Sequence, residues 1–216
     1  MTPFLLVLSA PSGGGKTTIA KALLAARDDL GYSVSATTRA PRPGEQNGVD
    51  YHFLSPAEFD RLIAAGEFLE WAEYGTRKYG TLQREIEDIM ASGRHVVLDI
   101  EIQGARAVRE RCRNVVSVFI IPPSAQTLVE RLGGRATEHR DDLRRRLERA
   151  IDELREAPSY DYVVVNADRA QAVAEVAAIM DAEGRRPAHL NDLEQQLDHL
   201  AAGIAAELTA LDLKQD

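Results

Sequence analysis

The sequence has little cysteine and no long apolar run. Its 216 residues include a single cysteine, Cys112, and one tryptophan. One cysteine cannot form a disulfide within the chain, which excludes a disulfide-built scaffold. No apolar run reaches the roughly 18 residues that a membrane-spanning helix needs. No secretory leader precedes the first apolar segment, so we expect a cytoplasmic protein with no membrane partner.

An excess of positive charge is also absent. The chain carries 26 Lys and Arg against 34 Asp and Glu, a formal net charge of −8 at pH 7. Nucleic-acid binders need positive surface, so we expect no nucleic-acid partner. The five histidines show no metal-ligand spacing, which argues against a zinc site. The length fits one sizeable domain, or one domain with an appendage.

The most informative segment lies near the N-terminus. An apolar run at residues 4–8 predicts a buried parallel strand, and residues 19–26 predict a helix. Between them lies the sequence Ala10-Pro11-Ser12-Gly13-Gly14-Gly15-Lys16-Thr17-Thr18. Glycine turns let backbone N–H groups surround a phosphate, and the helix N-terminus adds partial positive charge. Lys16 can then reach the β- and γ-phosphates of a nucleotide, and the Thr17 hydroxyl can ligate Mg²⁺. Ala10 stands where this pattern usually has glycine.

A second cluster occupies residues 32–53. Arg39 and Arg42 lie three positions apart among prolines that exclude a helix. Guanidinium groups bind phosphate bidentately, and the hydroxyls of Ser35 and Tyr51 add donors. Such a set suits a phosphate monoester, although two arginines alone also fit a solvated basic loop.

A third cluster contains Glu70, Tyr79 and Thr81. A carboxylate accepts both N–H donors on one edge of guanine, and a hydroxyl donates to its O6. Adenine lacks that donor pair and would leave the carboxylate unpaired. Glu70 and Thr81 therefore have the chemistry of a guanine site, and Tyr79 can donate to the same phosphate as the two arginines.

In order and spacing, these motifs resemble the guanylate kinase family over about residues 4 to 182. The resemblance implies phosphoryl transfer from ATP, with Mg²⁺, to GMP or dGMP. It also implies an α/β fold of the P-loop NTPase type, in three layers, with a parallel central sheet, a small mixed GMP-binding lobe and a helical lid. The GMP-binding positions that it implies are Ser35, Arg39, Arg42, Tyr51, Glu70, Tyr79, Thr81 and Glu101.

The resemblance assigns further roles outside the GMP lobe. Asp99 falls on an acidic position near Mg²⁺, which it would share with Thr17. Glu101 stands where many members carry Asp. Arg135 and Arg146, in a lid at about residues 128–147, would close over the triphosphate and act with Lys16 and Arg39 as the catalytic cations.

Two features of the second half of the chain leave alternatives open. Asn166, after the apolar run at 162–165, falls near the adenine of ATP in the family, but its residue type equally fits a polar end to a strand. In the lid, Arg140, Arg144, Arg145 and Arg149 have helical spacing opposite acidic residues, and we expect solvated ion pairs there.

The domain organisation follows from the apolar runs. We expect buried parallel strands at 4–8, 96–100, 115–121 and 162–165. Residues 1–184 form the kinase-like domain, with a core at 1–31 and 92–184 and a GMP-binding lobe at about 32–91 containing a short helix at 56–65. Residues 185–216 form a helical extension.

The extension carries an apolar stripe. Asn191 is the expected N-cap, with Glu194 three residues later. The stripe consists of Leu190, Leu193, Leu197, Leu200, Ile204, Leu208 and Leu211. It can dock on the chain's own core or pair with a second subunit. We favour pairing into a homo-oligomer, because the core is already complete without it.

Two other functions are alternatives to the guanylate kinase hypothesis. A guanylate-kinase-like protein-binding module generally lacks an intact phosphate loop, whereas Lys16 and Thr17 are present here. A P-loop kinase acting on a ribosyl phosphate should lack the guanine-reading pair, whereas Glu70 and Thr81 are present.

Overall fold

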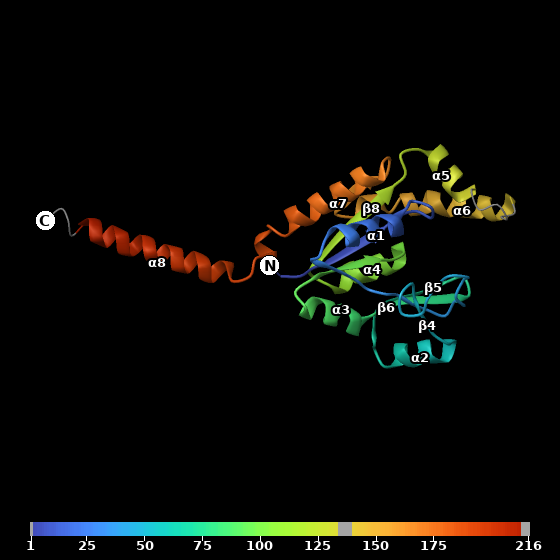
Figure 1. The fold of residues 1–216 in the computed structure, drawn as a ribbon, viewed down its shortest axis with the longest axis horizontal. Helices are drawn as coiled ribbons and strands as arrows, with labels where there is room; N and C mark the ends of the chain where they lie inside the picture. The colour runs from blue at the N-terminus through green and yellow to red at the C-terminus, as the bar shows by residue number, and fades with distance from the viewer. Residues whose placement is uncertain (1, 134–139, 213–216) are drawn as a thin grey trace.

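The fold is built on a five-stranded parallel sheet with helices on both faces (Figure 1). The computed structural model describes residues 2–133 and 140–212, with side chains omitted at 140–142 and 209–212. The strands run in the order β2-β7-β1-β8-β9. Their bounds are β1 Leu5–Ser9, β2 Leu30–Tyr32, β7 His95–Asp99, β8 Val115–Ile121 and β9 Tyr162–Val165.

The two faces of this sheet bury separate apolar cores. Helices α1 (Lys16–Ala26) and α7 (Arg169–Glu183) cover the face that carries Leu6 and Leu8. Helices α3 (Gln83–Ala91) and α4 (Ile102–Arg111) cover the face that carries Leu5 and Val7. Successive strand residues point to opposite faces, so an unbroken apolar strand such as β1 fits a sheet covered on both sides.

The last strand departs from the prediction. Residues 162–165 do form a parallel strand, but β9 lies at the edge of the sheet and is not fully buried. Val163 and Val165 are 47% and 45% exposed. The apolar sequence of β9 resembles that of the buried strands, so the sequence pattern alone does not distinguish an edge strand from a central strand.

A second, four-stranded sheet forms the small lobe. Its order is β4-β3-β6-β5. The elements are β3 Ala36–Thr37, β4 His52–Phe53, α2 Pro56–Ala64, β5 Phe68–Tyr74 and β6 Arg77–Leu82. The Phe59 ring of α2 stacks on Phe68 at 4.4 Å between centroids and anchors the helix to the sheet. Tyr32 is part of β2, which pairs with β7 in the main sheet. Helix α3 also packs against β7, so residues 83–91 contact the larger core.

Helices α5 (Ala125–Gly133) and α6 (Arg140–Leu154) lie at the same end of the molecule as the small lobe (Figure 1). Leu128 and Leu132 of α5 pack with Ala150 of α6 in a small core of their own. Short 3₁₀ turns follow at Ala157–Ser159 and Pro187–His189. None of the helices within the described residues is both long and apolar enough to cross a bilayer.

The C-terminal extension forms α8 (Leu193–Asp212), which projects away from the body of the protein (Figure 1). Asn191 is not its N-cap, contrary to the prediction. The Asn191 side chain instead accepts a hydrogen bond from the Thr2 hydroxyl. The first backbone hydrogen bond of the helix runs from the Gln196 N–H to the Asp192 carbonyl, so the helix begins after Asp192. The contact between Thr2 and Asn191 ties the base of the extension to the N-terminus of the chain.

Candidate active site

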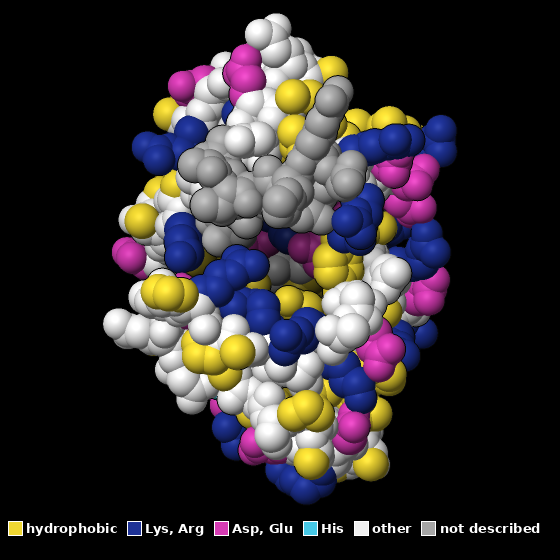
Figure 2. Space-filling view, turned by 90° about the vertical axis from the view of Figure 1, so that its right-hand side faces the viewer, with side chains coloured by type: hydrophobic (Ala, Val, Ile, Leu, Met, Phe, Trp, Pro, Cys, Tyr) yellow, Lys and Arg dark blue, Asp and Glu magenta, His cyan; other side chains and the backbone are white. Residues whose placement is uncertain are grey.

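A cleft of about 480 Å³ lies between the small lobe and the carboxyl end of the main sheet. Figure 2 shows Lys and Arg side chains gathered around a hollow on this face. Residues predicted as functional from well-separated segments meet in its lining: Lys16, Thr17, Ser35, Arg39, Arg42, Tyr51, Glu70, Tyr79, Asp99 and Glu101. These segments meet because strands β1 and β7 lie side by side and end at the same edge of the sheet.

The loop before α1 has the backbone geometry of an anion cradle. Gly13 and Gly15 have φ values of 82° and 95°, a region that L side chains rarely adopt. Gly15 is also the N-cap of α1, which begins at Lys16, three residues earlier than predicted. A Cβ added at Gly14 would lie 2.7 Å from the Cβ of Ala10. The loop therefore accommodates Ala10 because the residue packed against it has no side chain.

Two side chains hold this loop from behind. Asn166 is buried, and its Nδ2 donates to the Gly14 carbonyl at 3.0 Å. Arg131 of α5 donates in turn to the Asn166 carbonyl at 3.1 Å. The family resemblance predicts Asn166 near the adenine of ATP, whereas its hydrogen bond to the phosphate loop was not predicted. Arg131 was not singled out, because a single arginine on an amphipathic helix carries no distinguishing sequence signal.

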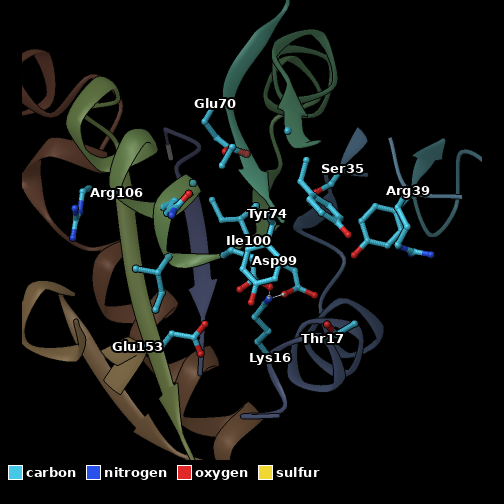
Figure 3. A pocket seen from close by; sticks show the side chains of 18 of the residues that line it. Lys16, Thr17, Ser35, Arg39, Glu70, Tyr74, Asp99, Ile100, Arg106 and Glu153 are labelled. Atoms are coloured by element: carbon cyan, nitrogen blue, oxygen red, sulfur yellow. Dashed lines mark hydrogen bonds and ion pairs between the residues drawn. The ribbon is translucent and has the colours of Figure 1, made fainter. Parts of the chain in front are cut away.

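Lys16 lies at the centre of the cleft between two carboxylates (Figure 3). Its Nζ is 2.8 Å from Glu101 Oε1 and 3.6 Å from Asp99 Oδ1. Burial alone would lower the Lys16 pKa, but the two carboxylates outweigh burial and the pKa is raised. Lys16 is therefore cationic throughout the physiological range. Glu101, predicted for the GMP side, is held by Lys16 in this structure.

Arg39 is fixed by a carboxylate that sequence reasoning did not single out. Its guanidinium donates to both oxygens of Glu45, at 2.9 and 2.8 Å, and Glu45 also accepts the backbone N–H of Arg42. Hydrogen bonds from Arg39 and Arg42 lower the pKa of Glu45 to about 2. The carboxylate thus occupies the bidentate position that a phosphate would also fit.

The arginine is flanked by aromatic rings. The Arg39 guanidinium lies 5.2 Å from the Tyr51 ring centroid, and Tyr51 meets Tyr79 edge to face at 6.2 Å. Burial raises the pKa of Tyr51, so its hydroxyl stays protonated and able to donate. Arg39, Arg42, Ser35 and the two tyrosines all reach the same cleft.

A buried carboxylate lies at the upper end of the cleft in Figure 3. Glu70 of β5 is 4% exposed, and its Oε1 accepts the Thr81 hydroxyl at 2.6 Å. Burial raises the pKa of Glu70, with the Thr81 hydrogen bond acting in the opposite direction. A Cβ added at Gly104 of α4 would lie 2.5 Å from Glu70 Oε2, so only glycine leaves this carboxylate in place. The close approach of Gly104 to Glu70 was not predicted from the sequence.

The lid helices give a mixed outcome. Arg135 lies outside the described residues. Arg146 donates to the Leu132 carbonyl at 3.4 Å and is not part of the described cleft lining. Arg144 forms the expected exposed pair with Glu148, at 2.9 Å. Arg149 is not a solvated pair as predicted, because its guanidinium lies over the Tyr74 ring and faces the cleft.

Comparison with known proteins agrees with this geometry. The sequence model of the guanylate kinase family matches residues 3–183. Guanylate kinases of Symbiobacterium thermophilum and Rubrobacter xylanophilus are 52% and 50% identical to the chain, over 84% and 82% of it and 86% and 92% of their own lengths. The crystal structure of guanylate kinase from Anaplasma phagocytophilum superposes with a TM-score of 0.76, at 36% identity, covering 92% of this chain and 95% of that one. With this fold, this cleft and these relatives, the chain belongs to the guanylate kinase family.

Proposed function

We propose that the protein transfers the γ-phosphoryl group of ATP to GMP, giving ADP and GDP, in the cytoplasm. The observation that carries the proposal is the buried Glu70, which accepts the Thr81 hydroxyl and lines the same cleft as Lys16. The pair matches the donor and acceptor edge of guanine. The neighbouring loop has the backbone geometry that binds nucleotide phosphates. GMP and dGMP share the guanine edge and the phosphate, so both are substrates on this proposal.

On the ATP side, the backbone from Ala10 to Thr18 surrounds the phosphates and Lys16 neutralises their charge. Asn166 stabilises the phosphate loop through its hydrogen bond to Gly14 and lies beside the bound ATP. The donors available for Mg²⁺ are the Thr17 hydroxyl and Asp99, whose buried Oδ1 accepts no hydrogen bond within the described residues. Hard oxygen donors of this kind suit Mg²⁺. When bound with ATP, the ion supplies charge neutralisation between the β- and γ-phosphates.

On the GMP side, the residues divide between phosphate and base. Donors to the phosphate are Ser35, Arg39, Arg42, Tyr51 and Tyr79. Glu70 accepts the two guanine N–H groups, and the Thr81 hydroxyl, which donates to Glu70 in this structure, turns to donate to O6. Glu101 lies at the boundary with Lys16. Because Arg39 already holds Glu45, the incoming phosphate either displaces that carboxylate or shares the guanidinium with it.

The mechanism needs no covalent intermediate and no strong base. The attacking phosphate oxygen of GMP is already anionic, so the cleft has only to align it in line with the γ-phosphorus. Lys16, together with Arg135 and Arg146 from the lid, neutralises charge on the transferring group, and Arg39 fixes the acceptor. Closing the cleft excludes water and limits hydrolysis of ATP.

The test measures ADP formation from ATP with Mg²⁺ and GMP, AMP, UMP or no acceptor. We expect turnover with GMP and little above background with the others. Glu70→Gln should lower kcat/KM for GMP by about 10²-fold, because the amide presents a donor where guanine also donates. Glu73→Gln, at an exposed position of the same strand, is the matched control. Equal loss of ATP and GMP binding in Glu70→Gln, or no turnover by a folded protein that binds GMP, would contradict the proposal.

We also propose that the protein self-associates through α8. Leu197, Leu200, Ile204 and Leu208 are 54–61% exposed, so within the described residues this face is not covered by the chain's own core. Their spacing of three and four residues forms a seam that a second copy can complete. Sedimentation velocity should show a dimer or larger oligomer that Leu200→Glu dissociates, with kcat unchanged. A monomeric wild-type protein at all concentrations would contradict this.

A further inference from the structure

The side chain of Glu85 uses both of its carboxylate oxygens to hold two separate segments of the chain. Glu85 lies in the first turn of helix α3. Its Oε2 accepts the backbone N–H of Val34 at 2.8 Å, and its Oε1 is hydrogen-bonded to Nε2 of the His52 ring. The side chains of Glu85 and His52 are only 22% and 27% exposed, so these contacts are partly withdrawn from water. One carboxylate therefore joins three distant places in the sequence.

The two segments that Glu85 holds carry proposed donors to the GMP phosphate. Ser35 follows Val34 directly, and Tyr51 directly precedes His52. Both Ser35 and Tyr51 line the cleft, whereas Glu85 is not part of the described cleft lining. The two segments also meet through the backbone, since the His52 N–H donates to the Ser35 carbonyl at 2.9 Å. Glu85 thus fixes the backbone beside two side chains that reach the cleft.

The position of Glu85 in the fold connects a third segment to the same point. Helix α3 begins directly after β6, the strand that carries Tyr79. Val34 lies between the end of β2 and the start of β3, so its N–H is outside both strands. A backbone N–H outside a strand still needs an acceptor when it is withdrawn from water, and Glu85 supplies it.

A second glutamate on the same helix shows the contrast with an ordinary surface contact. Glu87 is exposed and accepts a hydrogen bond from the Gln83 side chain at 2.8 Å, four residues earlier in α3. That contact stays within one helix and stabilises only the helix. The partners of Glu85 are 51 and 33 residues away in the sequence. Its loss would leave the half-buried Val34 N–H without this acceptor.

We propose that Glu85 is a positioning residue for the GMP phosphate, which fixes the backbone at Val34 and His52 so that the hydroxyls of Ser35 and Tyr51 meet one phosphate. This inference rests on the proposed function, because it takes these hydroxyls to bind the phosphate of GMP. Donors that are already ordered lose less conformational entropy on binding. Hydrogen bonds also weaken steeply when their geometry is displaced. Glu85 itself touches neither the base nor the phosphate.

This role separates the phosphate of GMP from its base. Guanosine carries the same base without a phosphate, so its affinity depends on Glu70 and not on the two hydroxyls. An ATP analogue binds the phosphate loop, with which Glu85 forms no hydrogen bond in the described part of the chain. Loss of Glu85 should therefore weaken GMP binding and leave the binding of guanosine and of the ATP analogue unchanged.

The experiment uses the full chain and three dissociation constants. Those for GMP and for the β,γ-methylene analogue of ATP with Mg²⁺ are measured by calorimetry, and that for guanosine by NMR titration. In Glu85→Ala we expect the GMP Kd to rise about tenfold and the other two to stay within about twofold. Glu85→Gln keeps an oxygen for the Val34 N–H and offers an N–H to the His52 ring, so it should restore most of the affinity.

Two further variants make the test independent of a single substitution. Glu87→Ala removes the same charge from an exposed position of α3, so this matched control should leave all three constants unchanged. His52→Phe removes one of the two Glu85 contacts and should raise the GMP Kd alone, by less than Glu85→Ala does. If Glu85→Ala does not fold, His52→Phe still tests the same separation of phosphate from base.

Three outcomes would overturn the inference. A GMP Kd unchanged in both Glu85→Ala and His52→Phe makes the contacts incidental. A rise that guanosine shares shows a general effect on the small lobe, and a rise in all three constants with a lowered melting temperature shows damage to the fold. A failure of the proposed function is distinct, because the wild-type protein would then bind neither GMP nor the ATP analogue. Wild-type binding of both, with unaffected variants, rejects only the role of Glu85.

Discussion

The two sides of the cleft recognise their ligands with different kinds of groups. The phosphate-loop side relies on backbone N–H groups, placed by the left-handed conformations of Gly13 and Gly15, and on one buried lysine. The small-lobe side presents side chains, among them Arg39 and the buried Glu70. On the proposed function, the backbone groups bind the phosphates that all nucleoside triphosphates share, and the side chains recognise what distinguishes guanine. Changes on the first side should therefore stop all turnover, and changes on the second should alter which nucleotide is used.

Both sides keep their cations paired before a ligand binds. Lys16 pairs with Glu101 and Asp99, and Arg39 pairs with both oxygens of Glu45. A poorly solvated cation without a partner would be costly, so these carboxylates stabilise the charges and fix their positions. On the proposed function, such fixed cations suit electrostatic stabilisation of the transferring group.

Replacing the loop lysine should produce the largest effect. We expect Lys16→Met to lower kcat by at least about 10³-fold, because the transferring phosphoryl group loses its central cation. The loss should be of similar size for GMP and dGMP, while the GMP Kd changes little. Single-turnover kinetics and calorimetry measure the two quantities. A large rise in the GMP Kd would contradict the assignment of ATP binding to one side of the cleft and GMP binding to the other.

The next effect should come from a residue that has no side chain of its own, Gly104. In Gly104→Ala the new Cβ would lie 2.5 Å from Glu70 Oε2, so the carboxylate must move. We expect KM for GMP to rise about tenfold, with KM for ATP within twofold, because a misplaced acceptor loses about 1 to 2 kcal/mol of hydrogen bonding. Gly203→Ala in α8, where a Cβ meets no atom within 4 Å, is the control. A GMP KM unchanged in Gly104→Ala would show that Glu70 tolerates displacement.

The same contrast explains what the sequence could predict. The phosphate loop is continuous in the chain, so its strand, glycine turn and helix were readable as one motif. The contacts in the cleft that were not predicted form between separate segments of the chain. Glu45 meets Arg39 through a turn, Gly104 meets Glu70 across two elements, and Arg149 meets Tyr74 across the lobes. Sequence periodicity predicts which face of a helix is polar, but it does not say which polar residue has a partner.

The extension shows a similar limit. The apolar stripe of α8 was readable from its spacing, and its exposure follows from the projection of the helix away from the body. The N-cap was predicted incorrectly because Asn191 fits the local capping pattern but is engaged by Thr2, from the opposite end of the chain. Local capping rules do not include such a competing partner.

The smallest effect should appear in the free energy of unfolding. Substitutions at Lys16 and Glu70, on the two sides of the cleft, should change it in opposite directions. The raised pKa of Lys16 means that its charged form is favoured by folding, so Lys16→Met should destabilise the protein and leave Asp99 without its cation. The pKa of Glu70 is raised above 4.5 by burial, so the folded state binds a proton more readily than the unfolded state. Its contribution to stability is full below about pH 4.5 and is lost as the pH rises through the folded-state pKa.

At pH 7, above the ordinary range of a carboxyl, burial of Glu70 therefore works against stability, and on the proposed function recognition of guanine requires that carboxylate. We expect Glu70→Gln, which still accepts the Thr81 hydroxyl, to raise the free energy of unfolding at pH 7. The gain should shrink toward zero near pH 4, where the wild-type carboxyl is protonated. Urea unfolding between pH 4 and 8 measures it, with Glu73→Gln as the control. A less stable Glu70→Gln at pH 7 would mean that the charged hydrogen bond to Thr81 outweighs burial, and that the specificity side is as stabilising as the phosphate side.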